Sequence, residues 1–416
     1  ITSEINKSKL TGLNTGAGAF GLADNQLETL TVSGDQNLTI TGAIPFGNAV
    51  GGKVVEATVD ATAATGKVSL NVSGTASTVQ VTGGTGDDTF NFGAELNKND
   101  VAEGGEGSDT LLIDAVALTT QTNQVTGFEK FGFNQTNADQ TMNQSKLPSS
   151  IQTLIVDGFD PNVAAGDETD ITISKVTEGS DVVIKKTQAD TNGAAAATDS
   201  GAGHGTRVVI TEASDNDTNS VSIKLDAVGG FTNTIVGAQG VGFGLDEVAA
   251  ANYETVNLTS SQNKAGTVTV NELRTLTATS AKTLTIDGNA DLIVNDLTSG
   301  ALALGTLDAT GLTGTFTLGG QSAAPVLGTT YKLPNTKNTI NVGASLDYLD
   351  SVTAGSHPSD VLTATLTGKT ATTGVLKIDG FETINLLTTG ANTLDLSGVT
   401  GASKITTTGN IQTITG

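Results

Sequence analysis

The 416-residue chain contains no cysteine, which excludes disulfides and a cysteine nucleophile. Only two histidines are present, His204 and His357, and no H-E-x-x-H pattern occurs, so a zinc protease of that kind is excluded within this sequence. The G-x-S-x-G and P-loop patterns are also missing. Zero cysteines fit a reducing cytosol or a secreted bacterial protein equally well. We therefore expect no enzyme and leave the compartment to other signals.

Aromatic residues make up only 4% of the chain and tryptophan is absent, which argues against a carbohydrate site built on stacked rings. The chain has 20 basic and 43 acidic residues, and its net charge of −23 argues against a basic surface for nucleic acid or anionic lipid. No run approaches the roughly 18 to 20 apolar residues of a membrane-spanning helix, and no signal peptide opens the sequence. Cations are the natural partners of such a chain.

The residues that are present favour short strands. Glycine and threonine are abundant, and runs such as residues 68–72, 267–270 and 283–286 alternate between apolar and polar side chains. A six-residue unit, apolar, then Glu/Gln/Arg, then Thr/Lys, then apolar-x-apolar, recurs at residues 27–32, 128–133, 151–156, 253–258, 273–278 and 381–386, and in truncated form at 411–414.

The spacing of apolar positions within this unit predicts a chain corner followed by a strand, as in one rung of a solenoid. We therefore expect an all-β protein, an irregular β-solenoid or β-helix with β-sandwich-like domains and a short calcium β-roll element. The unit also loosely resembles the strand of leucine-rich repeats, but the asparagine ladder and constant period of that class are missing.

We expect three parts: residues 1–145 with the calcium element, residues 146–245, and residues 246–416. A polar stretch at 134–150 lies near the first boundary, and the small-residue run 191–201 predicts an exposed loop. The sequence opens without methionine and stops within a strand-like pattern. We expect it to be part of a longer protein, with any export signal or anchor outside it.

Residues 83–91 and 104–112 both match the calcium-binding nonapeptide G-G-x-G-x-D-x-U-x. Calcium prefers several hard oxygens, which a glycine-rich turn supplies from carbonyl groups while an aspartate adds a carboxylate. The two copies start 21 residues apart, three more than the full turn of a regular β-roll, and the connection 94–103 can absorb the excess, which leaves both stacked and separated copies open. Glycine-aspartate turns that bind nothing are the plain alternative.

The carboxylates expected to bind calcium here are those of Asp88 and Asp109, with Asp87 and Asp100 in reserve. Carbonyl groups near four further residues complete the expected shell: Gly83, Thr85, Gly104 and Glu106. Weaker acidic turns keep an aspartate before a strand but lack the glycines, and they add Asp181, Asp215, Asp217 and Asp360 to the candidate Ca²⁺ ligands. As plain Asx turns that open a strand, these four need no ion.

Together, the nonapeptide pair, the Gly-Phe-Glu-Thr-Ile-Asn-Leu type unit, the segment 359–368, the lack of cysteine and the acidic Thr/Gly-rich composition resemble calcium-dependent bacterial surface-layer (S-layer) proteins of the repeats-in-toxin kind. The resemblance implies type I secretion and calcium-triggered self-assembly into a lattice on a Gram-negative cell surface. It also implies anchoring to lipopolysaccharide by a region outside this sequence. The long tandem nonapeptide blocks of that family are missing. The stalk of a large secreted calcium-binding adhesin or biofilm matrix protein is the alternative.

Overall fold

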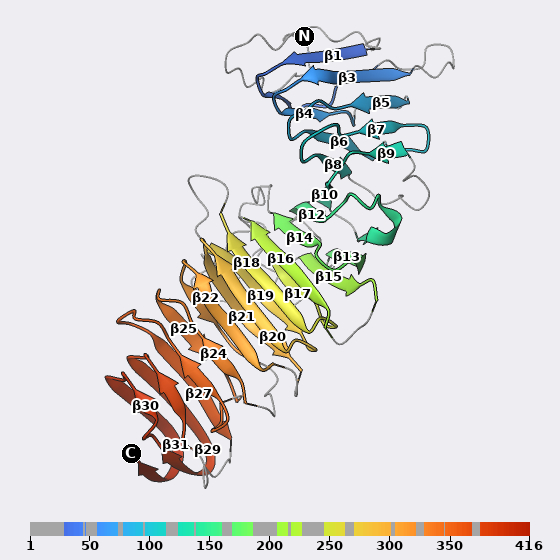
Figure 1. Ribbon diagram of the computed structural model, residues 1–416. Helices are drawn as coiled ribbons and strands as arrows, with labels where there is room; N and C mark the ends of the chain where they lie inside the picture. Colours follow the sequence, from blue (N-terminus) through green and yellow to red (C-terminus); the bar gives the residue numbers. More distant parts are fainter. Residues whose placement is uncertain are drawn as a thin grey trace, which may run out of the picture. The chain divides into compact units, whose positions relative to one another are not determined.

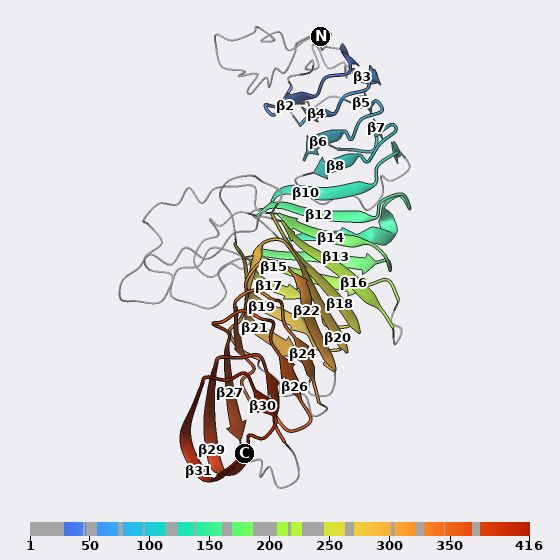
Figure 2. The same ribbon diagram turned by 60° about the vertical axis from the view of Figure 1, so that its left-hand side comes forward.

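The computed structural model describes residues 29–44, 46, 56–73, 78–94, 96–113, 124–136, 139–159, 169–185, 206–214, 218–226, 245–262, 270–300, 304–321, 328–344, 346–367 and 375–416. In this part of the chain the regular elements are strands and one short 3-10 helix, η3 (Gln144–Lys146). The strands pair in parallel (Figures 1 and 2). The expectation of an all-β solenoid is confirmed.

The chain divides into two compact units, residues 1–136 with 140–159, and residues 137–139 with 160–416. The three predicted parts with boundaries at 145 and 245 stay predictions. In the first unit, one sheet orders β1 (Thr29–Gly34), β3 (Ala57–Ala64), β5 (Val79–Thr82), β7 (Val101–Glu103) and β9 (Val125–Thr126). The other orders β2 (Leu38–Ile40), β4 (Val68–Asn71), β6 (Thr89–Gly93), β8 (Thr110–Ile113), β10 (Lys130–Thr136) and β12 (Thr153–Phe159). Strand β11 (Gln140–Asn143) precedes η3.

The second unit has the same construction with longer sheets. One sheet orders β14 (Asp181–Lys185), β16 (Ser220–Asp226), β18 (Thr255–Ser261), β20 (Thr283–Gly288), β22 (Thr306–Leu312), β24 (Thr330–Lys332), β26 (Ser351–Thr353), β28 (Lys377–Asp379) and β30 (Val399–Thr400). The other orders β13 (Thr169–Val176), β15 (Thr206–Glu212), β17 (Leu245–Ala249), β19 (Val270–Ala278), β21 (Asp291–Ser299), β23 (Phe316–Leu318), β25 (Asn338–Asn341), β27 (Val361–Thr367), β29 (Thr383–Asp395) and β31 (Lys404–Thr415).

Within each unit, a strand pairs with the strand two places later in the chain, because the chain alternates between the two sheets. One strand in each sheet makes one rung. In the units at 128–133, 151–156, 253–258 and 381–386 the strand, β10, β12, β18 or β29, begins at the third residue, so the first two residues mark the corner of the rung. The copy at 273–278 differs: it lies inside β19, where the pairing with β21 runs through both sides of Leu273.

The core consists of columns of side chains, one from each rung. In the first unit, Leu70, Phe90, Leu111, Phe131 and Leu154 occupy one register position and are buried. Each such side chain contributes about 1.5–3 kcal/mol relative to an exposed one. Parallel register therefore lets a simple alternation of apolar and polar residues build a continuous core through many rungs.

Residues 79–133 and 329–386 repeat the same succession of rungs. Strands β5, β7 and β9 correspond to β24, β26 and β28, while β6, β8 and β10 correspond to β25, β27 and β29. The first 29 positions align without a gap, at an offset of 250 residues, and β7 and β26 show the same alternation of half-buried, buried and exposed side chains. The two units thus each contain one copy of a duplicated module.

A matching turn in both copies supports the duplication. Gly93 and Gly343 have left-handed φ values of 55° and 54°, a conformation that favours glycine. The N–H of Gly93 donates to Asn91 Oδ1 at 2.9 Å, and the N–H of Gly343 donates to Asn341 Oδ1 at 3.0 Å. The identical backbone turn follows the same strand in each module, so the two regions can be compared residue by residue.

A search of the described residues for a helix with the length and apolar character needed to cross a membrane finds none.

Candidate metal centre

The predicted calcium aspartates stand at the corner of successive rungs in the first unit. Val68, Asp88, Asp109 and Glu129 stack in register where β4, β6, β8 and β10 begin, and we call these four residues the first corner column. The N–H of Val68 donates to Asp88 Oδ1 at 2.7 Å, the N–H of Asp88 to Asp109 Oδ1 at 2.7 Å, and the N–H of Asp109 to Glu129 Oε2 at 2.8 Å. Each carboxylate thus accepts a backbone N–H of the preceding rung.

Burial raises the pKa of both aspartates of this column. Asp88 and Asp109 are each 0% exposed. Burial raises the pKa of Asp109 to about 6, and the negative charges of Asp88, Glu129 and Asp87 add to the rise while the hydrogen bond from the Asp88 N–H opposes it. The pKa of Asp88 is also raised by burial, against hydrogen bonds from Gly84 and Val68.

The second oxygens of the two aspartates differ in their partners. Asp88 Oδ2 accepts the N–H of Gly84 at 2.7 Å. Asp109 Oδ2 is buried and has no hydrogen-bond partner. A buried carboxylate oxygen without a protein donor can be stabilised by a proton, by a water molecule or by a cation, and acidic neighbours at the same corner favour a proton or a cation. The column therefore contains one oxygen that is suited to a cation.

The close approach of neighbouring rungs requires glycine at several positions of the two nonapeptides. A Cβ on Gly83 would lie 1.8 Å from the carbonyl oxygen of Gly104, and a Cβ on Gly104 would lie 2.0 Å from that of Gly127. Gly105 and Gly107 have φ values of 106° and 116°, which side chains rarely permit. The rungs approach so closely at this corner that glycine is required whether or not an ion binds.

The two nonapeptides stack on each other, a point that their spacing in the sequence left open. The N–H of Gly83 donates to the carbonyl of Glu103 at 2.8 Å, and the N–H of Glu106 donates to that of Gly84 at 2.9 Å. Ser108 N–H also donates to Asp87 Oδ1 at 2.9 Å. The three extra residues between the copies do not separate them, because they lie in the connection between β6 and β7.

The predicted ligand set separates into an inner and an outer group. The inner group, Asp88 and Asp109 with Gly83 and Gly104, is buried, while three side chains of the outer group are exposed at the same corner: Thr85, Asp87 and Glu106. In the described residues, no three side chains of His, Cys, Asp or Glu come together closely enough to hold a metal ion. A calcium ion at this corner would therefore need carbonyl oxygens from the turns as well as the Asp109 carboxylate.

The second copy of the module, residues 329–386, has an equivalent column but no nonapeptides. Asn338, Asp360 and Glu382 stack where β25, β27 and β29 begin, and we call them the second corner column. The N–H of Asn338 donates to Asp360 Oδ1 at 2.7 Å, and the N–H of Asp360 donates to Glu382 Oε2 at 2.8 Å. Burial raises the pKa of Asp360, the Glu382 carboxylate adds to the rise, and the hydrogen bonds from Asn338 oppose it. The carboxylate ladder is thus independent of the glycine pattern.

A second pair of aspartates matches between the modules at the opposite corner. Asp100 Oδ1 accepts the N–H of Val79 at 2.8 Å, and its Oδ2 accepts that of Asn97 at 2.6 Å. Asp350 repeats this arrangement with the N–H groups of Thr329 and Asp347, both at 2.6 Å. Both carboxylates are buried and accept two backbone N–H groups each. Asp100, a reserve calcium ligand in the sequence interpretation, is therefore part of the rung corner.

The remaining predicted ligands are placed differently. Asp181 is exposed at the first position of β14, and the buried residue of that turn is Ser180, whose N–H donates to the carbonyl of Thr177 at 3.1 Å. Asp215 and Asp217 lie outside the described residues. Only Asp88, Asp109 and Asp360 of the predicted carboxylates are therefore shown in corner columns, while Asp87 lies beside the first one.

Sequence reasoning missed the glutamate of the six-residue unit. Glu129, Glu254 and Glu382 all hold its second position, and each accepts the N–H of the residue stacked on it in the preceding rung. For Glu254 that residue is Asn219, at 3.1 Å. The repeated acid directly before a strand was the available signal. At this position the glutamate carboxylate, rather than a backbone carbonyl, accepts the N–H of the preceding rung.

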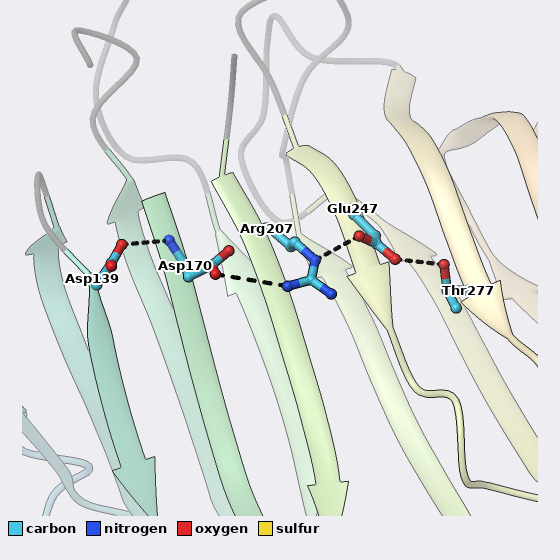
Figure 3. Close-up of polar contacts among 5 residues, drawn as sticks. All are labelled: Asp139, Asp170, Arg207, Glu247 and Thr277. Carbon is cyan, nitrogen blue, oxygen red and sulfur yellow. Dashed lines mark hydrogen bonds and ion pairs between the residues drawn. The ribbon is translucent and has the colours of Figure 1, made fainter. Parts of the chain in front are cut away.

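A different polar ladder crosses one sheet of the second unit (Figure 3). Asp170 N–H donates to Asp139 Oδ1 at 3.0 Å, and Arg207 lies between Asp170 Oδ2, 3.7 Å from its Nη1, and Glu247 Oε2, 2.6 Å from its Nε. Thr277 Oγ1 donates to Glu247 Oε1 at 2.5 Å. Arg207 is 33% exposed, so the ladder contributes modestly, within about 1 kcal/mol, to rung stacking.

Comparison of the chain with protein-family models, with curated proteins and with solved structures finds no match.

Proposed function

We propose that this chain is a structural protein of a calcium-dependent lattice on the outside of a bacterial cell, an S-layer, and that it has no catalytic role. The observation that carries the proposal is the first corner column. It combines buried carboxylates, an oxygen of Asp109 without a donor, and two stacked glycine turns rich in carbonyl groups. Oxygen atoms of this kind are the ligands that calcium prefers.

The outer residues of the same corner support a role in assembly. Asp87 and Glu106 are exposed beside the buried column, and the chain as a whole carries a net charge of −23. Copies with this charge repel each other until divalent ions neutralise their carboxylates, and calcium bound between copies then favours association. Calcium thus acts twice in the proposal, inside the rung corner and between protomers.

Binding at the inner site is tested with Asp109→Asn, which retains an oxygen for the N–H of Asp88 but removes the charge. In the wild type, added calcium should raise the midpoint of thermal unfolding relative to chelator, since a ligand that binds only the folded state stabilises it. We expect Asp109→Asn to lose most of this shift. The matched control is Asp181→Asn, an exposed position, which should respond as the wild type does. Equal calcium shifts in all three proteins would place the ion elsewhere.

Assembly is tested by calcium titration followed by light scattering and electron microscopy, with reversal by chelator. Ordered sheets that appear with calcium and dissolve with chelator are expected for the wild type. Soluble monomers or single rods at every calcium concentration would contradict the lattice and favour the stalk of a secreted adhesin. Sheets whose formation ignores calcium would contradict the role of the ion.

A further inference from the structure

The second corner column contains polar atoms that the protein itself does not satisfy. Asn338 and Asp360 are each 0% exposed. Asn338 Oδ1, Asp360 Oδ2 and Nδ1 of His357 are all buried atoms without a hydrogen-bond partner. His357 lies three residues before Asp360, in the turn that leads to β27. Buried polar atoms are nearly always paired, so three such atoms where two neighbouring rungs stack need an explanation.

The orientation of the Asn338 amide is fixed by its neighbours. Its Nδ2 donates to the carbonyl of Thr336 at 2.7 Å, to that of Pro334 at 3.0 Å and to Asp360 Oδ1 at 3.3 Å. An amide turned the other way would direct its oxygen at three acceptors, which the hydrogen-bond pattern excludes. The unpaired atom of Asn338 is therefore an acceptor. So is the unpaired oxygen of a charged Asp360, and neither can satisfy the other.

Two buried acceptors at one corner can be satisfied by a proton, by a water molecule or by a cation, and one water has only two protons to donate. Charged neighbours influence whether Asp360 holds a proton or faces a cation. Burial raises the pKa of Asp360 and the Glu382 carboxylate raises it further, whereas His357 lies close enough to lower it. A proton on Asp360 would satisfy one oxygen pair but would leave the imidazole nitrogen unpaired. A cation that accepts both oxygen and nitrogen ligands accounts for all three atoms.

The duplicated module shows what differs at this corner. Asn338 stands at the position of Asp88, and His357 stands at the position of Gly107. The first corner column thus offers oxygen ligands alone, while the second offers an amide oxygen, a carboxylate oxygen and an imidazole nitrogen. Calcium takes oxygen ligands, whereas borderline divalent ions such as Zn²⁺ bind imidazole together with carboxylate.

We infer that Asn338, His357 and Asp360 form a binding site for a borderline divalent transition-metal ion, distinct from the calcium corner of the first unit. Three protein ligands leave one tetrahedral position of such an ion for water or for a further oxygen of the corner. The neutral imidazole is the binding form, so acid weakens the site. The inference does not depend on the lattice.

The test measures Zn²⁺ binding by isothermal titration calorimetry after removal of metal with chelator. Three variants are compared with the wild type: His357→Ala, Asp360→Asn, which retains an acceptor for the N–H of Asn338, and His204→Ala as the control for the other histidine. We expect His357→Ala and Asp360→Asn to weaken zinc binding by more than about tenfold. His204→Ala should bind as the wild type does. Circular dichroism establishes that each variant is folded.

Thermal unfolding supplies a second readout. Zinc should raise the unfolding midpoint of the wild type and of Asp109→Asn, but not that of His357→Ala. Undiminished zinc binding by His357→Ala overturns the inference, as does a wild type that binds no zinc. A wild type that gains stability on acidification but not from zinc also overturns it, since the proton would then be the occupant. Because Asp109→Asn removes the calcium ligand alone, failure of the zinc site and failure of the calcium site give different results.

Discussion

The two copies of the module, residues 79–133 and 329–386, form equivalent rung corners from different side chains. Both stack acidic residues so that each accepts an N–H of the preceding rung. In the first copy the turn is built from glycines. In the second copy five of the six corresponding positions hold residues with side chains, including Ala354 where the first copy has Gly104, and only Gly355 is still a glycine. The carboxylate ladder and an unpaired carboxylate oxygen, at Asp109 and at Asp360, occur in both copies, so the glycine turns are what distinguishes the calcium corner of the first copy.

This comparison changes how the nonapeptides are understood. Their aspartates would be needed in a protein that binds no calcium, because the N–H groups of Val68 and Asp88 would otherwise be buried without an acceptor. An alanine variant of Asp88 or Asp109 therefore destabilises the protein in calcium and in chelator alike. Asparagine separates the two roles at Asp109, whose Oδ2 has no donor, since the amide keeps the acceptor for the Asp88 N–H and loses the charge.

The largest difference between the copies is expected at Gly104. In Gly104→Ala the new Cβ would lie 2.0 Å from the carbonyl oxygen of Gly127, and we expect the free energy of unfolding to fall by about 3 kcal/mol. The reverse exchange in the second copy, Ala354→Gly, should cost only about 1 kcal/mol or less. Guanidinium unfolding followed by circular dichroism measures both. Similar small losses would show that the rungs of the first unit can move apart.

Asp100 and Asp350 test whether the copies are equivalent where their sequences agree. Alanine at either position leaves two backbone N–H groups without their carboxylate acceptor, and we expect each variant to lose about 2 kcal/mol of unfolding free energy. The control Asp181→Ala removes an exposed carboxylate and should cost less than about 0.5 kcal/mol. A large loss of unfolding free energy at only one of the two positions would show that the matched aspartates do not contribute equally to stability.

The pH dependence of the unfolding free energy should differ with and without calcium, because Asp109 lies in the first corner column. The folded pKa of Asp109 is raised to about 6 from an unfolded value near 3.8, so the folded state holds the proton more tightly. In chelator its contribution to stability is therefore largest below about pH 4 and is lost as the pH rises through about 6. We expect an effect on the order of 1 kcal/mol relative to Asp109→Asn.

Calcium should reverse this trend, because it stabilises the charged carboxylate. Urea unfolding at a series of pH values, with and without calcium, measures the difference between wild type and Asp109→Asn. Parallel curves for the two proteins across this range would mean that Asp109 titrates as it does in the unfolded chain.

The smallest expected effect is the calcium response gained when the second corner is made to resemble the first. Asn338→Asp removes the amide that donates to the carbonyls of Pro334 and Thr336 and adds a carboxylate beside Asp360, so stability in chelator should fall by about 2 kcal/mol. Calcium should recover part of the loss, on the order of 1 kcal/mol, since the added oxygen is a hard ligand. Thermal unfolding in both media checks this, with Asp350→Asn as a variant of the opposite corner that gains no calcium response. A loss that calcium does not reverse would restrict calcium binding to the glycine turns.

Much of the fold follows from local sequence. Alternating runs predict strands, and the six-residue unit places β10, β12, β18 and β29 directly after chain corners. The stacking of the two nonapeptides was not predictable from their spacing, which is three residues longer than a regular β-roll turn and left it open. The helical turn and the register of individual pairs were not predictable either, and the unit at residues 273–278 predicts a corner inside what is a continuous strand, β19.

The local pattern of this chain establishes that it is all-β, that its corners are rich in glycine and acid, and that its rungs stack in parallel. The tertiary structure alone decides what each acid does. The partners of Asp88, Asp109 and Glu129 lie 20 or 21 residues away along the chain. That distance is set by the length of each connection between rungs, which no local periodicity encodes. For the same reason, only the folded rungs show which buried oxygens are satisfied by the backbone and which remain for a cation.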